Sequence, residues 1–139
     1  MRLTAFTDFG LRALMRMAGE PERGFSTAEL AAELGLSRHH LFKIMQRLAN
    51  AGIVTTRRGS GGGAMLARPA AEIRLGAIVR LLERGQPLVE CFGPGCECGL
   101  VRSCRLKARL RAAEAAFLAE LDRTTLAEVA LEAGALQGA

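Results

Sequence analysis

Four cysteines lie within one short segment of the chain, and the sequence contains no other cysteine. They are Cys91, Cys96, Cys98 and Cys104, with the spacing C-x4-C-x-C-x5-C. Clustered thiols in a reducing compartment favour metal binding over disulfides. Structural zinc sites favour paired knuckles, whereas a glycine-rich loop can direct backbone amides toward the sulfurs of an iron–sulfur cluster. The cysteines alone leave an iron–sulfur cluster, a zinc ion or redox thiols as alternatives.

A second chemical feature is a basic block from Arg38 to Arg68, which has six Lys or Arg and no Asp or Glu. The whole chain has a formal net charge of +5, so the rest of the chain is nearly neutral. A local basic surface is typical of a protein that binds a polyanion. A solvated surface helix would usually carry acidic residues among the basic ones. The basic block therefore predicts binding to nucleic acid.

Three helices are expected to position this block. Thr7 is expected to cap the first, which ends near Gly19. Ser26 and Glu29 form a capping box for the second, which ends at Gly35. Ser37 caps the third, whose apolar residues recur with helical spacing at Leu41, Ile44, Met45 and Leu48. A helix, a glycine-containing break and a basic helix predict a helix-turn-helix.

A glycine-rich turn follows the basic helix. Residues 53–58 and 64–67 are compatible with β-structure and flank the glycines of residues 59–63, which predicts a hairpin, the wing of a winged helix. Arg57 and Arg58 would suit phosphate oxygens or a narrow minor groove. The glycines also match a dinucleotide fingerprint in form. However, no helix can start before the Arg-Pro that follows, which argues against a nucleotide site.

The second half of the chain is expected to form a helix over residues 75–83, the cysteine loop and a long helix over residues 105–122. The long helix has apolar residues at steps of four, three, four and four, namely Leu106, Leu110, Ala113, Phe117 and Leu121. Such a seam needs a partner, and helix-turn-helix proteins commonly bind two-fold sites as dimers. We therefore expect a homodimer. Thr124 or Thr125 is expected to cap a short final helix.

These elements predict a mainly α fold with a small β-hairpin, that is, a winged helix-turn-helix plus a long dimerisation helix. The expected segments are a DNA-binding domain (1–84), a cysteine-rich cluster-binding loop (85–104), a dimerisation helix with a C-terminal helix (105–132) and a flexible tail (133–139). No apolar run is long enough to span a membrane and no secretory signal is present, so we expect a cytoplasmic protein. No catalytic set of residues is evident, so we expect no enzyme.

Longer motifs resemble the family of winged-helix iron–sulfur transcriptional repressors, most of all its NsrR-like, nitric-oxide-sensing branch, which is related to IscR and RirA. The resemblance covers nearly the whole chain. It rests on MRLTxFTDFGLRAL in residues 1–14, LSRHHLxK in residues 36–43, LxxAGxV in residues 48–54, RGxGGG in residues 58–63, CRLK in residues 104–107, and AFLAELDRxTLAE in residues 116–128.

The resemblance implies a 4Fe-4S cluster held by three cysteines, with a 2Fe-2S form on exposure to oxygen. Cys104, which precedes Arg-Leu-Lys, matches the last ligand, and Cys91, which follows Val-Glu, matches the first. Cys98 is the expected middle ligand because its x5 gap to Cys104 matches. Cys96 is the alternative because some members keep its x4 gap from Cys91.

The fourth ligand distinguishes the branches of the family. Cluster-assembly regulators place a His three residues after the last cysteine, where this chain has Lys107. The resemblance therefore implies Asp8 of the partner subunit as the fourth ligand. Without the resemblance, Asp8 is explained as a first-turn carboxylate that the helix dipole stabilises. A fourth thiolate is a further candidate.

The implied function is that of a transcriptional repressor that leaves its operator when nitric oxide reacts with the cluster. The expected partners are a palindromic double-stranded DNA operator, a second copy of the chain, and nitric oxide as the signal. Two alternatives are an iron-supply or redox-responsive regulator that uses the same cluster, and a zinc-stapled DNA-binding regulator. The expected DNA contacts are Ser26, Thr27, Ser37, Arg38, His39, His40, Lys43, Arg57, Arg58 and Ser60.

Overall fold

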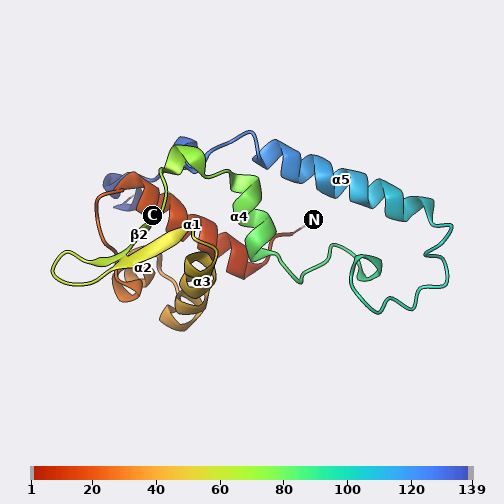
Figure 1. Ribbon diagram of the computed structural model, residues 1–139, viewed down its shortest axis with the longest axis horizontal. Helices are drawn as coiled ribbons and strands as arrows, with labels where there is room; N and C mark the ends of the chain where they lie inside the picture. The colour runs from red at the N-terminus through yellow and green to blue at the C-terminus, as the bar shows by residue number, and fades with distance from the viewer. Residues whose placement is uncertain (1, 138–139) are drawn as a thin grey trace.

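The computed structural model describes residues 2–137. This part of the chain is mainly helical with one two-stranded antiparallel hairpin, which confirms the predicted fold class (Figure 1). The hairpin and the cysteine loop lie at opposite ends of the long axis of the molecule. The elements are α1 (Ala5–Gly19), α2 (Thr27–Leu34), α3 (Arg38–Asn50), β1 (Val54–Arg57), β2 (Gly63–Leu66), α4 (Leu75–Leu82), α5 (Arg105–Leu121) and the short 3₁₀ helices η1 (Ala70–Glu72), η2 (Glu90–Phe92), η3 (Leu126–Val129) and η4 (Ala133–Gln137).

The first helix begins earlier than the sequence predicted. The N-cap is Thr4 and not Thr7, because the Thr4 backbone is extended and its hydroxyl accepts a hydrogen bond from the Thr7 amide at 3.3 Å. Thr7 itself lies inside α1 and is fully buried. The predicted end of this helix at Gly19 is confirmed. Asp8 therefore lies in the first turn of α1 rather than immediately after its cap.

The helix-turn-helix forms as its capping residues predict. The Ser26 hydroxyl accepts from the Glu29 amide at 3.1 Å, and the Ser26 amide donates to the Glu29 carboxylate at 3.0 Å. Gly35 ends α2 with a positive φ of 64°, a conformation that glycine adopts without strain. Ser37 then caps α3 by accepting from the amide of His40. These local signals confirm the predicted boundaries of both helices.

The hydrophobic core lies where α1, α3 and α4 pack against one another. Gly10 permits close packing of α1 on α4, since a Cβ at this position would lie only 2.5 Å from Leu82 Cδ1. Burial of each large apolar side chain contributes roughly 1.5–3 kcal/mol to folding. The fully buried members from these three helices are Ala13, Leu14, Leu41, Ile44, Leu48 and Ile78.

The hairpin is attached to the helical body through Phe25. β1 pairs with β2 from Val54 opposite Leu66 to Arg57 opposite Gly63. Phe25, just before α2, exchanges two backbone hydrogen bonds with Ala64, at 2.9 and 2.7 Å. This bridge adds a third backbone segment to the hairpin, so the wing is held against the start of α2.

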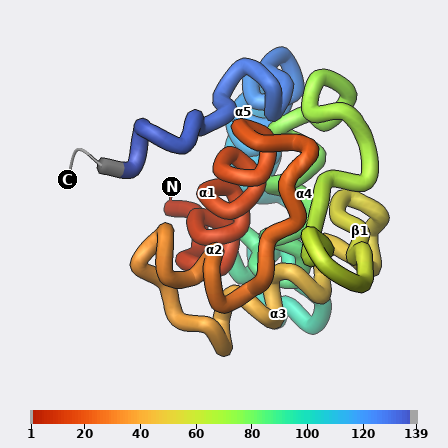
Figure 2. The backbone as a smooth tube through the Cα atoms, turned by 90° about the vertical axis from the view of Figure 1, so that its left-hand side faces the viewer, coloured from red at the N-terminus to blue at the C-terminus, as the bar shows by residue number. Residues whose placement is uncertain are grey.

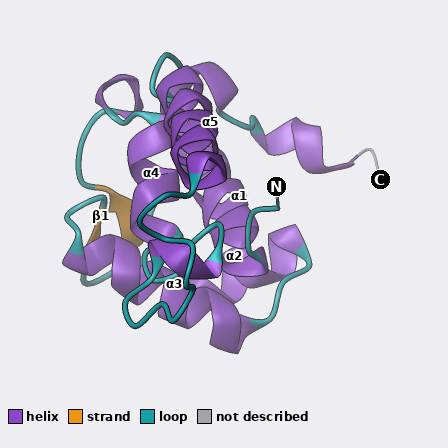
Figure 3. Cartoon of the chain, turned by 90° about the vertical axis from the view of Figure 1, so that its right-hand side faces the viewer, coloured by secondary structure: helices purple, strands orange, loops and turns teal. Residues whose placement is uncertain are grey.

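The long helix α5 projects away from the body of the molecule, and the cysteine loop connects its far end to α4 (Figures 1 and 3). Its C-terminal end is fastened to α4, where Arg80 donates a hydrogen bond to Asp122 at 2.9 Å. Gly76 leaves room for this contact, since a Cβ there would collide with the Asp122 carboxylate. No residue of α5 is buried. Of the predicted apolar seam, Leu106 and Ala113 are exposed, whereas Leu110, Phe117 and Leu121 are partly buried.

The short final helix that the sequence predicted is a 3₁₀ helix. Thr125 forms the expected cap, with Glu128 completing a capping box, but only the four residues of η3 follow. The last described turn, η4, runs away from the helical body (Figure 2). It occupies residues 133–137 of the predicted tail, while residues 138 and 139 lie outside the described part of the chain.

Candidate functional site

The outward side of α3 carries the DNA contacts predicted for the recognition helix. Ser37 caps the helix, and Arg38, His39, His40 and Lys43 lie in its first two turns; all five residues are exposed. In helix-turn-helix proteins, base contacts come mainly from the N-terminal part of the second helix. The exposed positions on α3 are therefore suitably placed to enter a major groove.

The tip of the hairpin carries the predicted wing contacts. Arg57 lies at the end of β1, and Arg58 and Ser60 follow in the turn; all three are exposed. Gly59 and Gly61 have positive φ values of 98° and 73°, so the tip turns sharply without strain. Within residues 2–137, neither arginine of the wing forms an ion pair. Both guanidinium groups remain available for phosphate oxygens.

The start of α2 lies between α3 and the wing. Thr27 and the exposed Ser26 border a groove of about 300 Å³ that α3 and the two strands also line. The backbone amide and then the hydroxyl of Ser26 lower the pKa of Glu29. The Ser26 hydroxyl is thus already engaged in the capping box, so any contact with a phosphate would use its remaining hydrogen-bonding capacity.

One member of the basic block serves an internal contact. Arg47, in the last turn of α3, donates a hydrogen bond from Nη1 to the carbonyl oxygen of Leu82 at 3.2 Å. Its guanidinium also lies over the ring of Phe6, 4.6 Å from the centroid. The sequence analysis assigned Arg47 no function, because its two partners lie in α1 and α4 and leave no local signal around residue 47.

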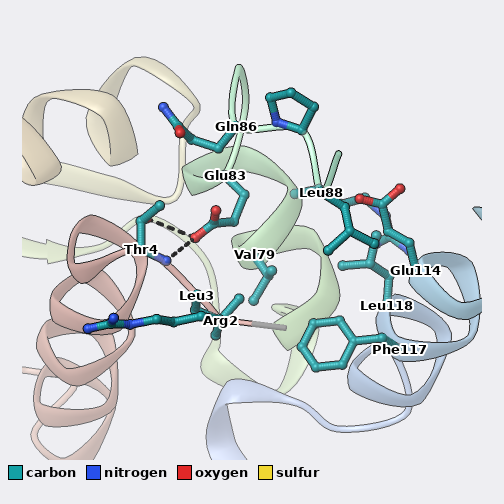
Figure 4. A pocket seen from close by; sticks show the side chains of 12 residues that line it. Arg2, Leu3, Thr4, Val79, Glu83, Gln86, Leu88, Glu114, Phe117 and Leu118 are labelled. Carbon is teal, nitrogen blue, oxygen red and sulfur yellow. Dashed lines mark hydrogen bonds between the residues drawn. The ribbon is translucent and has the colours of Figure 1, made fainter. Parts of the chain in front are cut away.

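A second contact joins the start of α1 to the end of α4. The backbone amide and the hydroxyl of Thr4 both donate to Glu83 Oε1 at 2.8 Å (Figure 4). Partial burial acts to raise the pKa of Glu83, but hydrogen bonds from Thr7 and Thr4 outweigh it, so the pKa lies below the ordinary 4.5. We call Thr4, Phe6, Arg47, Leu82 and Glu83 the N-terminal joint. It connects the start of α1 to the recognition helix and to the end of α4, which leads into the cysteine loop.

The four cysteines are free thiols in the loop between α4 and α5. Cys98 is exposed and the other three are partly buried. Cys91 lies in the short turn η2, which is tied to α5 because Arg111 lies 4.8 Å above the ring of Phe92. Cys104 is the N-cap of α5, and its sulfur accepts a hydrogen bond from the Lys107 amide at 3.4 Å. Two of the predicted ligands are thus held by secondary structure.

The predicted ligands are not assembled into a metal centre within one chain. Among residues 2–137, no three His, Cys, Asp or Glu side chains lie close enough to hold a metal ion. Asp8 is half-exposed and forms an ion pair with Arg12 at 2.7 Å. This geometry agrees with the simple explanation of Asp8 as a first-turn carboxylate, and it leaves the ligand set as a prediction.

An open cleft of about 710 Å³ separates the N-terminal arm from α5 (Figure 4). Leu3 before α1, Val79 of α4, Leu88 of the following loop and Phe117 of α5 contribute apolar side chains. Glu114 of α5 lies at the same cleft. Because this space lies between them, α5 approaches its own domain closely only near its C-terminal end.

Along residues 2–137, no helix has both the length and the apolar character that crossing a bilayer requires.

Comparison with known proteins places this arrangement in a defined family. Residues 3–132 match the family described as "Rrf2: Iron-dependent Transcriptional regulator". Among solved structures, IscR from T. potens is 26% identical, with a TM-score of 0.74 over 91% of this chain and 84% of that chain.

The chain also matches structures of CymR from two organisms. The oxidised form from Staphylococcus aureus is 30% identical, with a TM-score of 0.71 over 94% of this chain and 96% of that chain. CymR from B. subtilis, described as its global cysteine regulator, is 30% identical with a TM-score of 0.68 and the same coverage.

These matches confirm three predictions, namely the winged-helix architecture, the resemblance to a family of transcriptional regulators, and the absence of an enzymatic function. The family match covers the helix-turn-helix, the wing, the cysteine loop and α5 in one continuous alignment. The exposed basic residues of α3 and the wing agree with DNA binding, which is the family's function. The chain therefore belongs to the Rrf2 family of DNA-binding transcriptional regulators.

Proposed function

We propose that the protein is a homodimeric repressor whose affinity for a palindromic operator is controlled by an iron–sulfur cluster that reacts with nitric oxide. The observation that supports it most is the N-terminal joint. Through this joint, the helix that begins beside Asp8, the recognition helix and the end of α4 contact one another directly. A change at the cysteine loop or at Asp8 would therefore reach α3 through few contacts.

The donor set suits an iron–sulfur cluster in its chemistry. All four cysteines are free thiols, and thiolates are the preferred ligands of such clusters. The backbone amide of Lys107 already donates a hydrogen bond to the Cys104 sulfur, as amides around an iron–sulfur cluster do. Under this proposal Cys91, Cys98 and Cys104 are ligands, with Cys96 as the alternative to Cys98. The family's description as iron-dependent also supports an iron centre.

The chain's own residues provide the coupling. Asp8 of the partner subunit would complete the ligand set. Its coordination would restrict the position of the first turn of α1 in the subunit that contributes it. Thr4 and Phe6 lie in or next to that turn and contact Glu83 and Arg47, respectively. When bound, a 4Fe-4S cluster supplies iron that binds nitric oxide and releases protein ligands. Release of Asp8 would relax α1 and, through Arg47, reorient α3. Couplings of this kind are typically 1–3 kcal/mol, or about 5- to 150-fold in affinity.

The first test is anaerobic purification, followed by a visible spectrum and analysis of iron, sulfide and zinc. The proposal predicts a broad visible band, with about four iron and four sulfide per subunit for the cluster type that it names. Cys98→Ser should remove the cluster, whereas Cys96→Ser should retain it. A colourless protein with one zinc would contradict the sensor while leaving DNA binding intact.

The second test measures how far the reaction with nitric oxide changes the affinity for the operator. An operator duplex, isolated from a random pool by binding to the holoprotein, is titrated with protein before and after treatment with nitric oxide under anaerobic conditions. We expect nitric oxide to weaken binding at least about fivefold. The Arg47→Met variant should keep the iron and sulfide content of the wild type. Its operator affinity should fall less after nitric oxide treatment, because the substitution removes the contact between α3 and α1. Equal affinity of the untreated and treated wild-type protein would contradict the switch.

A second candidate function is regulation by iron supply or redox state through the same loop. The specific observation in its favour is the additional thiol, since Cys96 and Cys98 are both free and separated by one residue. The similarity to CymR, the global cysteine regulator of B. subtilis, points in the same direction. Loss of operator binding under iron depletion, without any response to nitric oxide, would favour this function.

A further inference from the structure

An exposed phenylalanine stands among the polar residues of the recognition helix. Phe42 has 53% of its surface exposed, although it lies in the middle of α3. The other large exposed apolar residues in the described part of the chain, Leu100 and Leu106, belong to the cysteine loop and α5. Phe42 is therefore the one that lies on the surface predicted to face DNA.

Phe42 is not part of the buried side of α3. The buried side of the helix consists of Leu41, Ile44, Met45 and Leu48. At about 100° per residue, Phe42 lies roughly 60° from His39 and roughly 40° from Gln46 around the helix axis. His39, Lys43 and Gln46 are all exposed. Phe42 thus shares the outward side of α3 with polar residues that can contact bases or phosphates.

No cation–π contact holds the ring within the described part of the chain. Phe6, Phe25 and Phe92 each lie beneath an arginine guanidinium, whereas no such contact involves Phe42 within residues 2–137. One edge of Phe42 borders the groove between α3, the start of α2 and the hairpin. The remaining surface faces outward, beside Lys43.

The major groove offers one apolar group to such a ring. The 5-methyl group of thymine projects into it, and apolar side chains, phenylalanine among them, distinguish thymine by contact with that methyl. Lys43 follows Phe42 in α3, and Arg57 and Arg58 lie at the tip of the hairpin whose strands line the same groove as Phe42, so a phosphate backbone would neutralise nearby positive charge. A nucleic-acid partner therefore fits this surface better than an apolar protein partner, which would have to desolvate the same cations.

We infer that Phe42 contacts the 5-methyl group of a thymine in each half-site of the operator and so determines the preference for thymine at that position. This deepens the proposed function, because it rests on entry of α3 into the major groove. It adds to the predicted contacts an apolar one that charge patterning does not identify. Gln46, one turn further along α3, is positioned to contact a neighbouring base.

The test removes only the methyl group. A duplex selected by the full-length wild-type protein is resynthesised with deoxyuridine in place of thymine, one position at a time and in both half-sites together. Loss of one buried methyl is worth about fourfold in affinity per half-site, and so roughly 15-fold for the pair. Wild-type protein should lose this affinity at one position, whereas Phe42→Ala should bind the thymine and deoxyuridine duplexes equally.

Two further variants separate this contact from general effects. Phe42→Leu should keep part of the discrimination because it keeps an apolar contact. Lys43→Ala should weaken binding to all duplexes but retain the deoxyuridine effect. The inference is overturned if Phe42→Ala discriminates as wild type does, or if no thymine position is sensitive. The inference is also overturned if Phe42→Ala changes the oligomeric state of the protein but keeps the wild-type difference in affinity between the thymine and deoxyuridine duplexes. That result would assign the ring to a protein contact.

These outcomes differ from a failure of the sensor. A protein that lacks a cluster or ignores nitric oxide, yet shows the Phe42-dependent deoxyuridine effect, would refute the proposed signal and support this contact. A wild-type protein that enriches no duplex would refute the DNA interface and this inference together.

Discussion

At the scale of single residues, the most unusual side chain is an arginine within the core. Arg16 is only 2% exposed, and it pairs with Glu33 through Nε and with Glu20 through Nη2, both at 2.7 Å. Its guanidinium also lies 5.0 Å from the centroid of the Phe25 ring. Nη1 has no hydrogen-bond partner within the described chain. Arg16 therefore ties the end of α1 to α2 and to the segment that holds the hairpin.

We predict that Arg16→Met destabilises the fold. The methionine fills a similar space but removes one of the two cations that the carboxylates of Glu20 and Glu33 share. Because these carboxylates are partly exposed and Arg23 still contacts both, we expect a loss of about 2–3 kcal/mol, below the full cost of breaking a buried pair. Urea unfolding at neutral pH measures it. The matched control is Arg123→Met, whose exposed pair with Glu120 should contribute less than about 1 kcal/mol. Equal effects of the two variants would contradict the role of Arg16.

Glu83 gives stability a defined dependence on pH. Its pKa in the folded protein lies below the ordinary 4.5, so its stabilising effect is present above pH 4.5 and is lost as pH falls through the lower folded value. We expect Glu83→Gln to lose about 1 kcal/mol at neutral pH, because a neutral acceptor replaces a charged one. The difference from wild type should vanish at acidic pH. Thermal unfolding over this pH range tests it, with the exposed Glu72→Gln as the variant expected to behave as wild type.

At the scale of elements, the wing depends on close backbone packing. Gly63 combines a positive φ of 130° with a position where a Cβ would lie 2.7 Å from the backbone of Phe25. Gly59 also has a positive φ, of 98°, but nothing lies within 4 Å of its Cβ position. A substitution at Gly59 would therefore introduce backbone strain alone. A substitution at Gly63 would also disturb the bridge between the hairpin and Phe25.

We predict that Gly63→Ala costs more than Gly59→Ala. Backbone strain at either position is worth roughly 1–2 kcal/mol. The collision at Gly63 adds roughly 1–3 kcal/mol and should detach the hairpin from Phe25. Hydrogen exchange at the amides of Phe25 and Ala64 measures this detachment. Only Gly63→Ala should expose these amides and weaken operator binding; unchanged protection in this variant would refute the bridge as the attachment of the wing.

At the scale of the whole molecule, α5 is attached to its own domain mainly near its C-terminal end, where Arg80 contacts Asp122. The helix has 17 residues and none of them is buried, and Leu106 at its start is 64% exposed. Most of the stability of a helix in a protein comes from tertiary packing of its apolar side, so the N-terminal part of α5 needs further contacts. Members of the family typically act as dimers, and the apolar seam of α5 supplies the surface that the proposed homodimer requires.

We predict that Leu106→Glu converts the dimer to a monomer at micromolar concentration, because the new carboxylate would be buried in the seam without a partner. Ala115→Glu is the control, since this residue is exposed and lies about 180° around α5 from Leu106. Light scattering during size exclusion distinguishes the two. A dimer that persists in Leu106→Glu would place the dimer contact elsewhere.

The sequence by itself determined the local elements of this protein. Ser26, Glu29, Gly35 and Ser37 mark helix ends correctly because capping acts between residues that are close in the chain. The glycine-rich tip and its flanking strands are local in the same sense, as is the start of α5 at Cys104. The start of α1 was wrongly predicted at Thr7, because the burial of Thr7 inside the helix depends on tertiary packing and only the structure shows Thr4 as the cap.

Only the tertiary structure decided what the long-range residues do. Arg47 was one cation of a basic block in the sequence, and its role in the N-terminal joint depends on a carbonyl 35 residues away. Phe42 carried no charge or metal-binding signal, and its exposure became evident only when the opposite side of α3 was packed into the core. The physical reason is the range of the interactions. Capping and apolar spacing act within a few residues, whereas ion pairs, cation–π contacts and burial depend on which helices meet in space.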